Sequence, residues 1–199
     1  MNNPSKYLES LVKEFSKLPG IGVKTASRLA FHMLDLASGE VEKLARSMIE
    51  LKENIKHCLK CGGISDEDIC TICSDDSRDS ATICVVEHAR DILTIENTGE
   101  YKGIYHVLMG VISPLDGIGP EDLNIASLID RCKENKVGEV ILAIGPRIEG
   151  DATSLYLARI LEELSINVSR IAHGLPVGSD LEFADSATII KSIEGRVKI

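Results

Sequence analysis

The chain has 199 residues, of which 44% are hydrophobic and 27% charged, and this globular composition excludes an intrinsically disordered protein. No apolar run approaches the roughly 20 residues that a membrane-spanning helix needs, which excludes an integral membrane protein. The N-terminal stretch carries scattered charges and lacks the apolar centre of a secretory signal peptide. We therefore expect a cytoplasmic protein.

The formal net charge of −9 argues against nucleic-acid binding by the chain as a whole. The charge is unevenly distributed, however. Residues 1–60 carry 10 lysines and arginines against 7 acidic residues, whereas residues 61–199 carry 12 against 24. We therefore expect any contact with DNA in the N-terminal segment, and metals, protein partners or solvent against the acidic remainder.

Apolar residues recur at helical spacing from Lys6 to about His57. Residues 18–26, Leu-Pro-Gly-Ile-Gly-Val-Lys-Thr-Ala, interrupt this pattern and connect two predicted helices. Gly20 and Gly22 permit a tight turn with exposed backbone amides, and amides that lead into a helix N-terminus attract a phosphate oxygen. The sequence therefore predicts a phosphate-binding turn.

Basic side chains follow this turn on one helix face, because Lys24 and Arg28 are four residues apart and can extend a contact along a nucleic-acid backbone. Ile21 and Ala26 are the positions expected to be buried. The pattern resembles a helix-hairpin-helix motif, which binds the DNA backbone without sequence preference. The alternative is an ordinary corner between helices with solvated basic side chains.

Two Cys-x-x-Cys pairs, separated by eight residues, predict a structural zinc site that holds one Zn²⁺ per chain. The expected ligands are Cys58, Cys61, Cys70 and Cys73. The alternatives are a redox pair or buried free thiols. His57 is expected to end a helix rather than to act as a fifth ligand, and Cys84 and Cys132 are expected to be packed thiols.

Beyond residue 80, strand-like and helix-like segments alternate, which favours a mostly parallel sheet covered by helices. The expected strands are residues 81–87, 104–108, 139–144 and 167–172. The expected helices are residues 91–97, 121–135, 152–164 and 187–194.

Three carboxylates follow two of these strands, and they converge if the strands are neighbours. They are Glu87, Glu149 and Asp151. Such a cluster can hold Mg²⁺, and the arrangement resembles a Toprim domain, whose pattern is a Glu after one strand and Asp-x-Asp after a later one. Here the second element reads Glu-Gly-Asp. The alternative is that Glu149 and Asp151 cap a helix that begins at Ala152.

The order of these elements resembles the bacterial RecR family of recombination mediators over essentially the whole chain. Similar segments are residues 18–28, 87–91, 99–101, 105–107, 110–114, 117–122, 149–150 and 171–178. The resemblance implies an α/β protein with a helical helix-hairpin-helix region (1–56), a four-cysteine zinc finger (57–76), a Toprim-like parallel-sheet domain (79–174) and a C-terminal segment for subunit contacts (175–199).

The resemblance also implies a function. RecR-like proteins form ring-shaped tetramers that encircle DNA and work with RecO and RecF to place RecA on single-strand gaps coated by SSB. Gly20, Gly22, Lys24 and Arg28 match the DNA-binding hairpin, and Glu149 with its neighbours matches the Toprim surface implicated in RecO and DNA interaction. No catalytic residue is expected, and the protein would associate with the nucleoid.

The chain departs from the family pattern at three places. Ile144-Gly145-Pro146, followed by Arg147, stands where Thr-Asn-Pro is usual, and we expect this change to remove polar side chains from the strand end. Val23 replaces a common proline, which would mainly preset the start of a helix. His88 stands where Asp or Ser is usual.

Three functions remain open at the level of the sequence. The first is a non-enzymatic DNA clamp and recombination mediator. The second is a magnesium-dependent Toprim nuclease or topoisomerase-like enzyme that uses Glu87, Glu149 and Asp151. The third is an interaction module stabilised by zinc, with no role at DNA.

Overall fold

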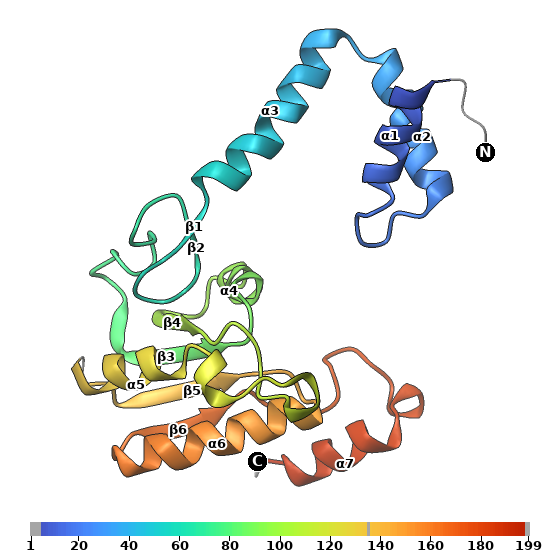
Figure 1. The fold of residues 1–199 in the computed structure, drawn as a ribbon. Helices are drawn as coiled ribbons and strands as arrows, with labels where there is room; N and C mark the ends of the chain where they lie inside the picture. The colour runs from blue at the N-terminus through green and yellow to red at the C-terminus, as the bar shows by residue number, and fades with distance from the viewer. Residues whose placement is uncertain (1–4, 135, 198–199) are drawn as a thin grey trace. The chain divides into compact units, whose positions relative to one another are not determined.

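The computed structural model describes residues 5–134 and 136–197 and divides into two compact units, Met1–Ile55 and Lys56–Ile199 (Figure 1). Each unit is considered by itself. None of the helices in the described ranges combines the length and the apolar character that crossing a membrane requires.

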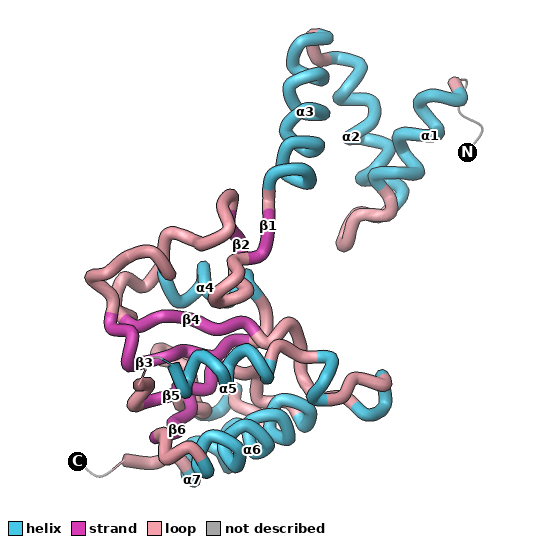
Figure 2. The backbone as a smooth tube through the Cα atoms, turned by 60° about the vertical axis from the view of Figure 1, so that its left-hand side comes forward, coloured by secondary structure: helices cyan, strands magenta, loops and turns pink. Residues whose placement is uncertain are grey.

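The first unit contains α1 (Lys6–Phe15), α2 (Val23–Asp35) and α3 (Ser38–Asn54). Helices α1 and α2 lie side by side (Figures 1 and 2). Their contact buries Leu8 of α1 and two alanines of α2, whose small side chains let the helix axes approach. Helix α3 buries no residue. The helical character predicted from Lys6 to about His57 is confirmed as far as Asn54.

The second unit opens with a short antiparallel pair, β1 (Lys56–His57) and β2 (Ile64–Ser65). His57 therefore lies in a strand, and the expectation that it ends a helix was wrong. The reason is local pairing: the backbone of His57 pairs with Ile64, and its Nδ1 lies 3.1 Å from the carbonyl oxygen of Gly62. The imidazole of His57 therefore contacts the backbone of the loop that carries the cysteines.

A four-stranded sheet forms the centre of the second unit (Figure 2). Its strands are β3 (Asp79–Val86), β4 (Gly103–Val107), β5 (Glu139–Ala143) and β6 (Asn167–Arg170). The spatial order is β4-β3-β5-β6 and every pairing is parallel, as the alternating pattern predicted. Strands β3 and β5 are neighbours, so the carboxyl ends that precede the predicted acidic residues lie next to each other.

Helices cover both faces of this sheet. On one face, Ile83 and Val85 of β3 pack with residues of α5 (Ile125–Glu134) and α6 (Ile148–Glu163) in the larger apolar core. On the other face, Cys84 and Val86 pack with α4 (Ala89–Glu96) in a smaller core. The side chains of β3 alternate between the two cores because successive residues of a strand point to opposite faces. Cys84 and Cys132 are buried thiols in these cores, as expected.

The largest differences from the expected helix boundaries are at the starts of α5 and α6. Helix α6 begins at Ile148 rather than Ala152, so Glu149 and Asp151 lie within its first turn. Helix α5 begins at Ile125 because Pro120–Asp122 forms a separate 3-10 turn, η2. Two further 3-10 turns are η1 (Pro114–Asp116) and η3 (Leu181–Phe183), and the C-terminal helix α7 spans Ser186–Glu194.

A buried polar network connects β4 to α5. His106 of β4 is fully buried, and its Nε2 lies 2.7 Å from the carbonyl oxygen of Asn124, to which it can only donate. Its Nδ1 is therefore the acceptor that faces Arg131 Nη1 at 3.2 Å, and the same Nη1 donates to the Tyr105 carbonyl. Burial lowers the pKa of His106 to about 4, so the ring is neutral near pH 7.

Candidate zinc centre and nucleic-acid interface

The loop between α1 and α2 contains a β-turn whose residues suit its geometry. The Ile21 amide donates to the Leu18 carbonyl at 3.0 Å, which closes a four-residue turn. Pro19 occupies the second position and Gly20, with φ of +77°, the third. This combination is the sequence signature of a type II turn, where a positive φ at the third position favours glycine. Ala26 is fully buried as predicted, whereas Ile21 is half-buried.

The N-terminus of α2 carries no protein cap. Gly22 is the N-cap residue and has no side chain to offer, and the first turn contains no acidic residue. The first amides of a helix lack acceptors within the helix and carry its positive dipole end. Lys24 and Arg28 are exposed on α2 and form no ion pair with another side chain in the described ranges. The turn and the basic residues thus present donors to an anion.

The four predicted zinc ligands converge. Their sulfur atoms all lie within 4.8 Å of one another, and Cys61 Sγ lies 3.6 Å from Cys70 Sγ. Tetrahedral zinc with sulfur ligands at about 2.3 Å places the sulfur atoms about 3.8 Å apart. The ligand set is Cys58, Cys61, Cys70 and Cys73. The spacing of the sulfur atoms therefore fits structural zinc.

Backbone amides support the thiolates. The amide of Gly63 lies 3.3 Å from Cys61 Sγ, and the amide of Cys70 lies 3.3 Å from Cys58 Sγ. A hydrogen bond from the Cys73 thiol lowers the pKa of Cys61 to about 5, whereas burial raises the pKa of Cys70 to about 11. The Cys61 thiolate therefore forms readily while the Cys70 thiol keeps its proton, so zinc binding must release a proton from Cys70.

The cysteine loop also packs on the sheet. The amide of Val107, in the edge strand β4, donates to the Cys61 carbonyl at 2.8 Å. Gly62 has a φ of +73°, and a β-carbon there would lie 3.3 Å from Val107 Cβ. A glycine is needed here because both the backbone conformation and the close approach disfavour a side chain. The zinc loop thus covers part of an otherwise open sheet edge.

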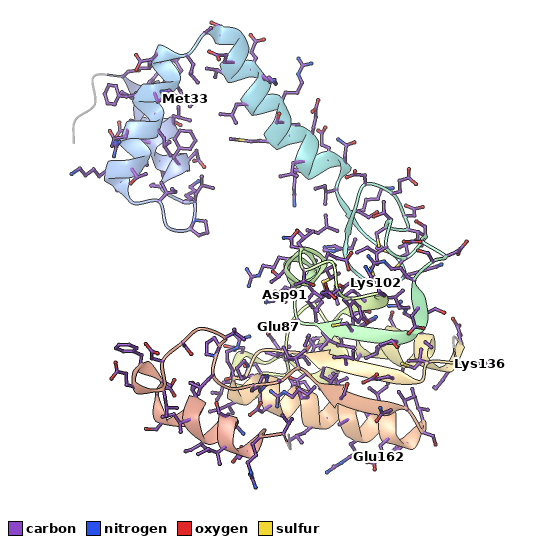
Figure 3. All side chains as sticks on the ribbon, turned by 180° about the vertical axis from the view of Figure 1, so that it is seen from behind. Met33, Glu87, Asp91, Lys102, Lys136 and Glu162 are labelled. Atoms are coloured by element: carbon purple, nitrogen blue, oxygen red, sulfur yellow. The ribbon has the colours of Figure 1, made fainter. Side chains whose placement is uncertain are left out.

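The carboxyl ends of β3 and β5 bring Glu87 next to a cation. Glu87 follows β3 and is buried, and its Oε1 accepts a hydrogen bond from Arg147 Nη2 at 2.5 Å. His88 Nε2 lies 3.2 Å from the same oxygen. Figure 3 shows Glu87 and Asp91 near the end of β3 and the start of α4. The Asp91 side chain accepts from the His88 amide at 2.8 Å and so caps α4.

The other two predicted acidic residues lie in the first turn of α6. Asp151 forms an ion pair with Arg170 of β6, whose guanidinium lowers the pKa of the Asp151 carboxyl. Glu149 is half-buried. Across residues 5–134 and 136–197, the four cysteines are the one group whose ligand atoms come together as metal ligands do. The sheet brings Glu87, Glu149 and Asp151 to one edge without gathering their carboxylates.

Models of known protein families match most of the chain between residues 8 and 197. A RecR helix-hairpin-helix model matches residues 8–52, and a model of the RecR four-cysteine zinc finger domain matches residues 55–75. A Toprim domain model matches residues 81–172, and a RecR C-terminal model follows at residues 174–197. The chain belongs to the RecR family. The four cysteines of this RecR-family chain form a structural zinc site.

The RecR-family fold shows two site residues that sequence reasoning missed. In the sequence, Arg147 stands out only as part of a departure from the family pattern, and Arg170 lies within the expected strand 167–172. Their partners Glu87 and Asp151 lie 60 and 19 residues away in the chain. No local pattern in the sequence signals a pairing at such separations. Ile144, the first residue of the same departure, is fully buried in the larger core.

Proposed function

We propose that this RecR-family protein is a non-enzymatic mediator of recombinational DNA repair that binds the DNA backbone through the hairpin between α1 and α2. By the family resemblance, it acts at the nucleoid and works with RecO and RecF to load RecA on SSB-coated gaps. The observation that carries the proposal is the uncapped N-terminus of α2, followed by the exposed Lys24 and Arg28. Phosphate contacts of this kind read no base sequence.

Assembly into a ring is the second part of the proposal. Helix α3 exposes an apolar series at helical spacing that includes Leu44, Met48 and Leu51, and it buries none of its 17 residues. The C-terminal segment likewise exposes Val177 and Phe183. Apolar surfaces of this kind favour contacts between protein chains. A tetramer would place several hairpins around one DNA, so weak contacts add up despite the net charge of −9.

Catalysis at the Toprim edge has little support from the side-chain arrangement. Glu87 and Asp151 each face a guanidinium group, from Arg147 and Arg170 respectively. A magnesium-dependent nuclease needs carboxylates that are available to the metal and converge on it. The four-cysteine site fits a closed structural metal without a substrate position. We therefore favour a mediator over the Toprim enzyme.

The test is a fluorescence-anisotropy titration of a gapped DNA at salt concentrations from about 50 to about 200 mM, comparing the full chain with the Lys24→Ala/Arg28→Ala variant. Each phosphate contact contributes about 0.9 to the slope of log K against log salt, so two contacts contribute about 1.8 per engaged subunit. That contribution corresponds to roughly a 12-fold loss of affinity over this salt range. The variant should bind more weakly and with a shallower slope.

The matched control is Lys43→Ala/Arg46→Ala, which removes one lysine and one arginine from exposed positions of α3 in the same unit. This control should retain the slope of the wild type. An equal loss of slope in both variants would show that the hairpin is not the contact. Absence of binding by the wild type even at low salt would contradict direct DNA binding by this chain.

A further inference from the structure

A pocket of about 300 Å³ lies where the Toprim fold implies a magnesium ion, beyond the carboxyl ends of β3 and β5. Its charged and imidazole lining residues are Glu87, His88, Arg90, Asp91, Arg147 and His173. Basic and imidazole groups therefore outnumber carboxylates around the acidic residue that would hold a metal. This composition differs from a magnesium site, which is built from oxygen ligands.

Glu87 is the only one of the predicted ligands in the lining of this pocket, and its carboxylate is already engaged. The side chain is 10% exposed. Its Oε1 receives Arg147 Nη2 at 2.5 Å and faces His88 Nε2 at 3.2 Å. A buried carboxylate without a compensating charge is costly, and a guanidinium at hydrogen-bond distance compensates it directly.

The backbone around Arg147 places its side chain over Glu87. Arg147 is the N-cap residue of α6, and its amide donates to the Gly145 carbonyl at 2.8 Å. A β-carbon on Gly150 would lie 2.1 Å from the Gly145 carbonyl oxygen, so only glycine lets the first turn of α6 approach this loop. A β-carbon on Gly145 would meet both Arg147 Nε and Glu87 Oε2 within 4 Å. A side chain at position 145 would therefore lie directly against the pair formed by Arg147 and Glu87.

The other two predicted ligands, Glu149 and Asp151, do not add a carboxylate to this pocket. Asp151 is paired with Arg170 on β6, away from Glu87, and does not line the pocket. Mg²⁺ requires a nearly octahedral set of oxygens and loses its water reluctantly. A metal at Glu87 would have to displace Arg147, and the second carboxylate in the lining, Asp91, already accepts a hydrogen bond from the His88 amide.

We propose that Arg147 takes the place of a divalent cation in this Toprim pocket, so that its guanidinium balances the buried charge of Glu87 and the site binds no Mg²⁺. Arg147 is a permanent part of the chain, whereas a bound metal ion exchanges with the solvent. The net charge of the site is therefore independent of the magnesium concentration. This charge balance belongs to the pocket alone and does not depend on DNA binding.

The experiment titrates Mn²⁺, as a paramagnetic probe for a magnesium site, into the zinc-loaded full chain and follows water-proton relaxation. The wild type should show no saturable Mn²⁺ site. Arg147→Ala leaves Glu87 without its cation and should gain one saturable site, which Glu87→Gln in the same background should remove. Arg90→Ala is the matched control, since Arg90 lines the same pocket but is 78% exposed and lies 3.9 Å from Asp91. It should bind no Mn²⁺.

Thermal unfolding supplies an independent measurement. At constant ionic strength, Mg²⁺ should raise the melting temperature of Arg147→Ala and leave that of the wild type unchanged. If Arg147→Ala does not fold, Arg147→Gln removes the same charge while keeping an N–H donor, and the same gain of one Mn²⁺ site is expected. A saturable Mn²⁺ site in the wild type that Glu87→Gln abolishes would overturn the proposal. Failure of a folded Arg147 variant to gain a site would do so as well.

Discussion

Acid should weaken the second unit through His106, which is fully buried and whose pKa is lowered by burial to about 4. In the unfolded chain the ordinary value is 6.5. Between these two pH values the His106 imidazole is protonated in the unfolded chain but neutral in the folded chain. The contribution of His106 to the free energy of unfolding is therefore fully present above pH 6.5 and is lost as the pH decreases toward 4. From about pH 7 to about pH 5, linkage gives a loss of about 2 kcal/mol from this one residue.

The perturbation is His106→Gln, which cannot titrate in this range. A glutamine amide can still donate to the Asn124 carbonyl and accept from Arg131, so the variant retains partners for the network in place of the imidazole. Its free energy of unfolding should depend less steeply on pH than that of the wild type, by about 2 kcal/mol between about pH 7 and about pH 5.

Urea unfolding followed by tyrosine fluorescence measures this difference, because three of the four tyrosines lie in the second unit. Both proteins are kept zinc-loaded and are compared at each pH, so that effects of acid on the cysteines cancel in the difference. Parallel pH profiles for the two proteins would refute the argument, since they would show that His106 is not held neutral by burial. A steeper profile for the variant would refute it equally.

Two further predictions concern zinc and assembly. Elemental analysis of the folded wild type should give one zinc per chain, and Cys61→Ser should lower the zinc content and the melting temperature because metal binding contributes to folding of so small a loop. An unchanged melting temperature would contradict a structural site. Met48→Glu, which places a charge in the exposed apolar series of α3, should reduce the mass measured by light scattering, whereas Arg46→Glu on the opposite face of the same helix should not. Equal masses for wild type and Met48→Glu would argue that α3 is not a subunit contact.

Features built from residues close together in the chain were determined by the sequence itself. The Pro19-Gly20 turn closes over four residues, and its geometry depends on the φ preferences of those two residue types. The two Cys-x-x-Cys pairs lie within 16 residues, and their spacing suffices to predict the zinc ligands. The four parallel strands follow from short apolar segments that alternate with helical periodicity.

The ion pairs at the Toprim edge were decided only by the tertiary structure. Glu87 and Arg147 are 60 residues apart in the chain, and the sheet brings them together because β3 and β5 are neighbours. Asp151 lies in the first turn of α6 and is paired with Arg170 of β6, 19 residues away, because β5 and β6 are neighbours in the sheet. The sequence therefore located the acidic residues, but the packing of distant segments determined which cation each of them faces.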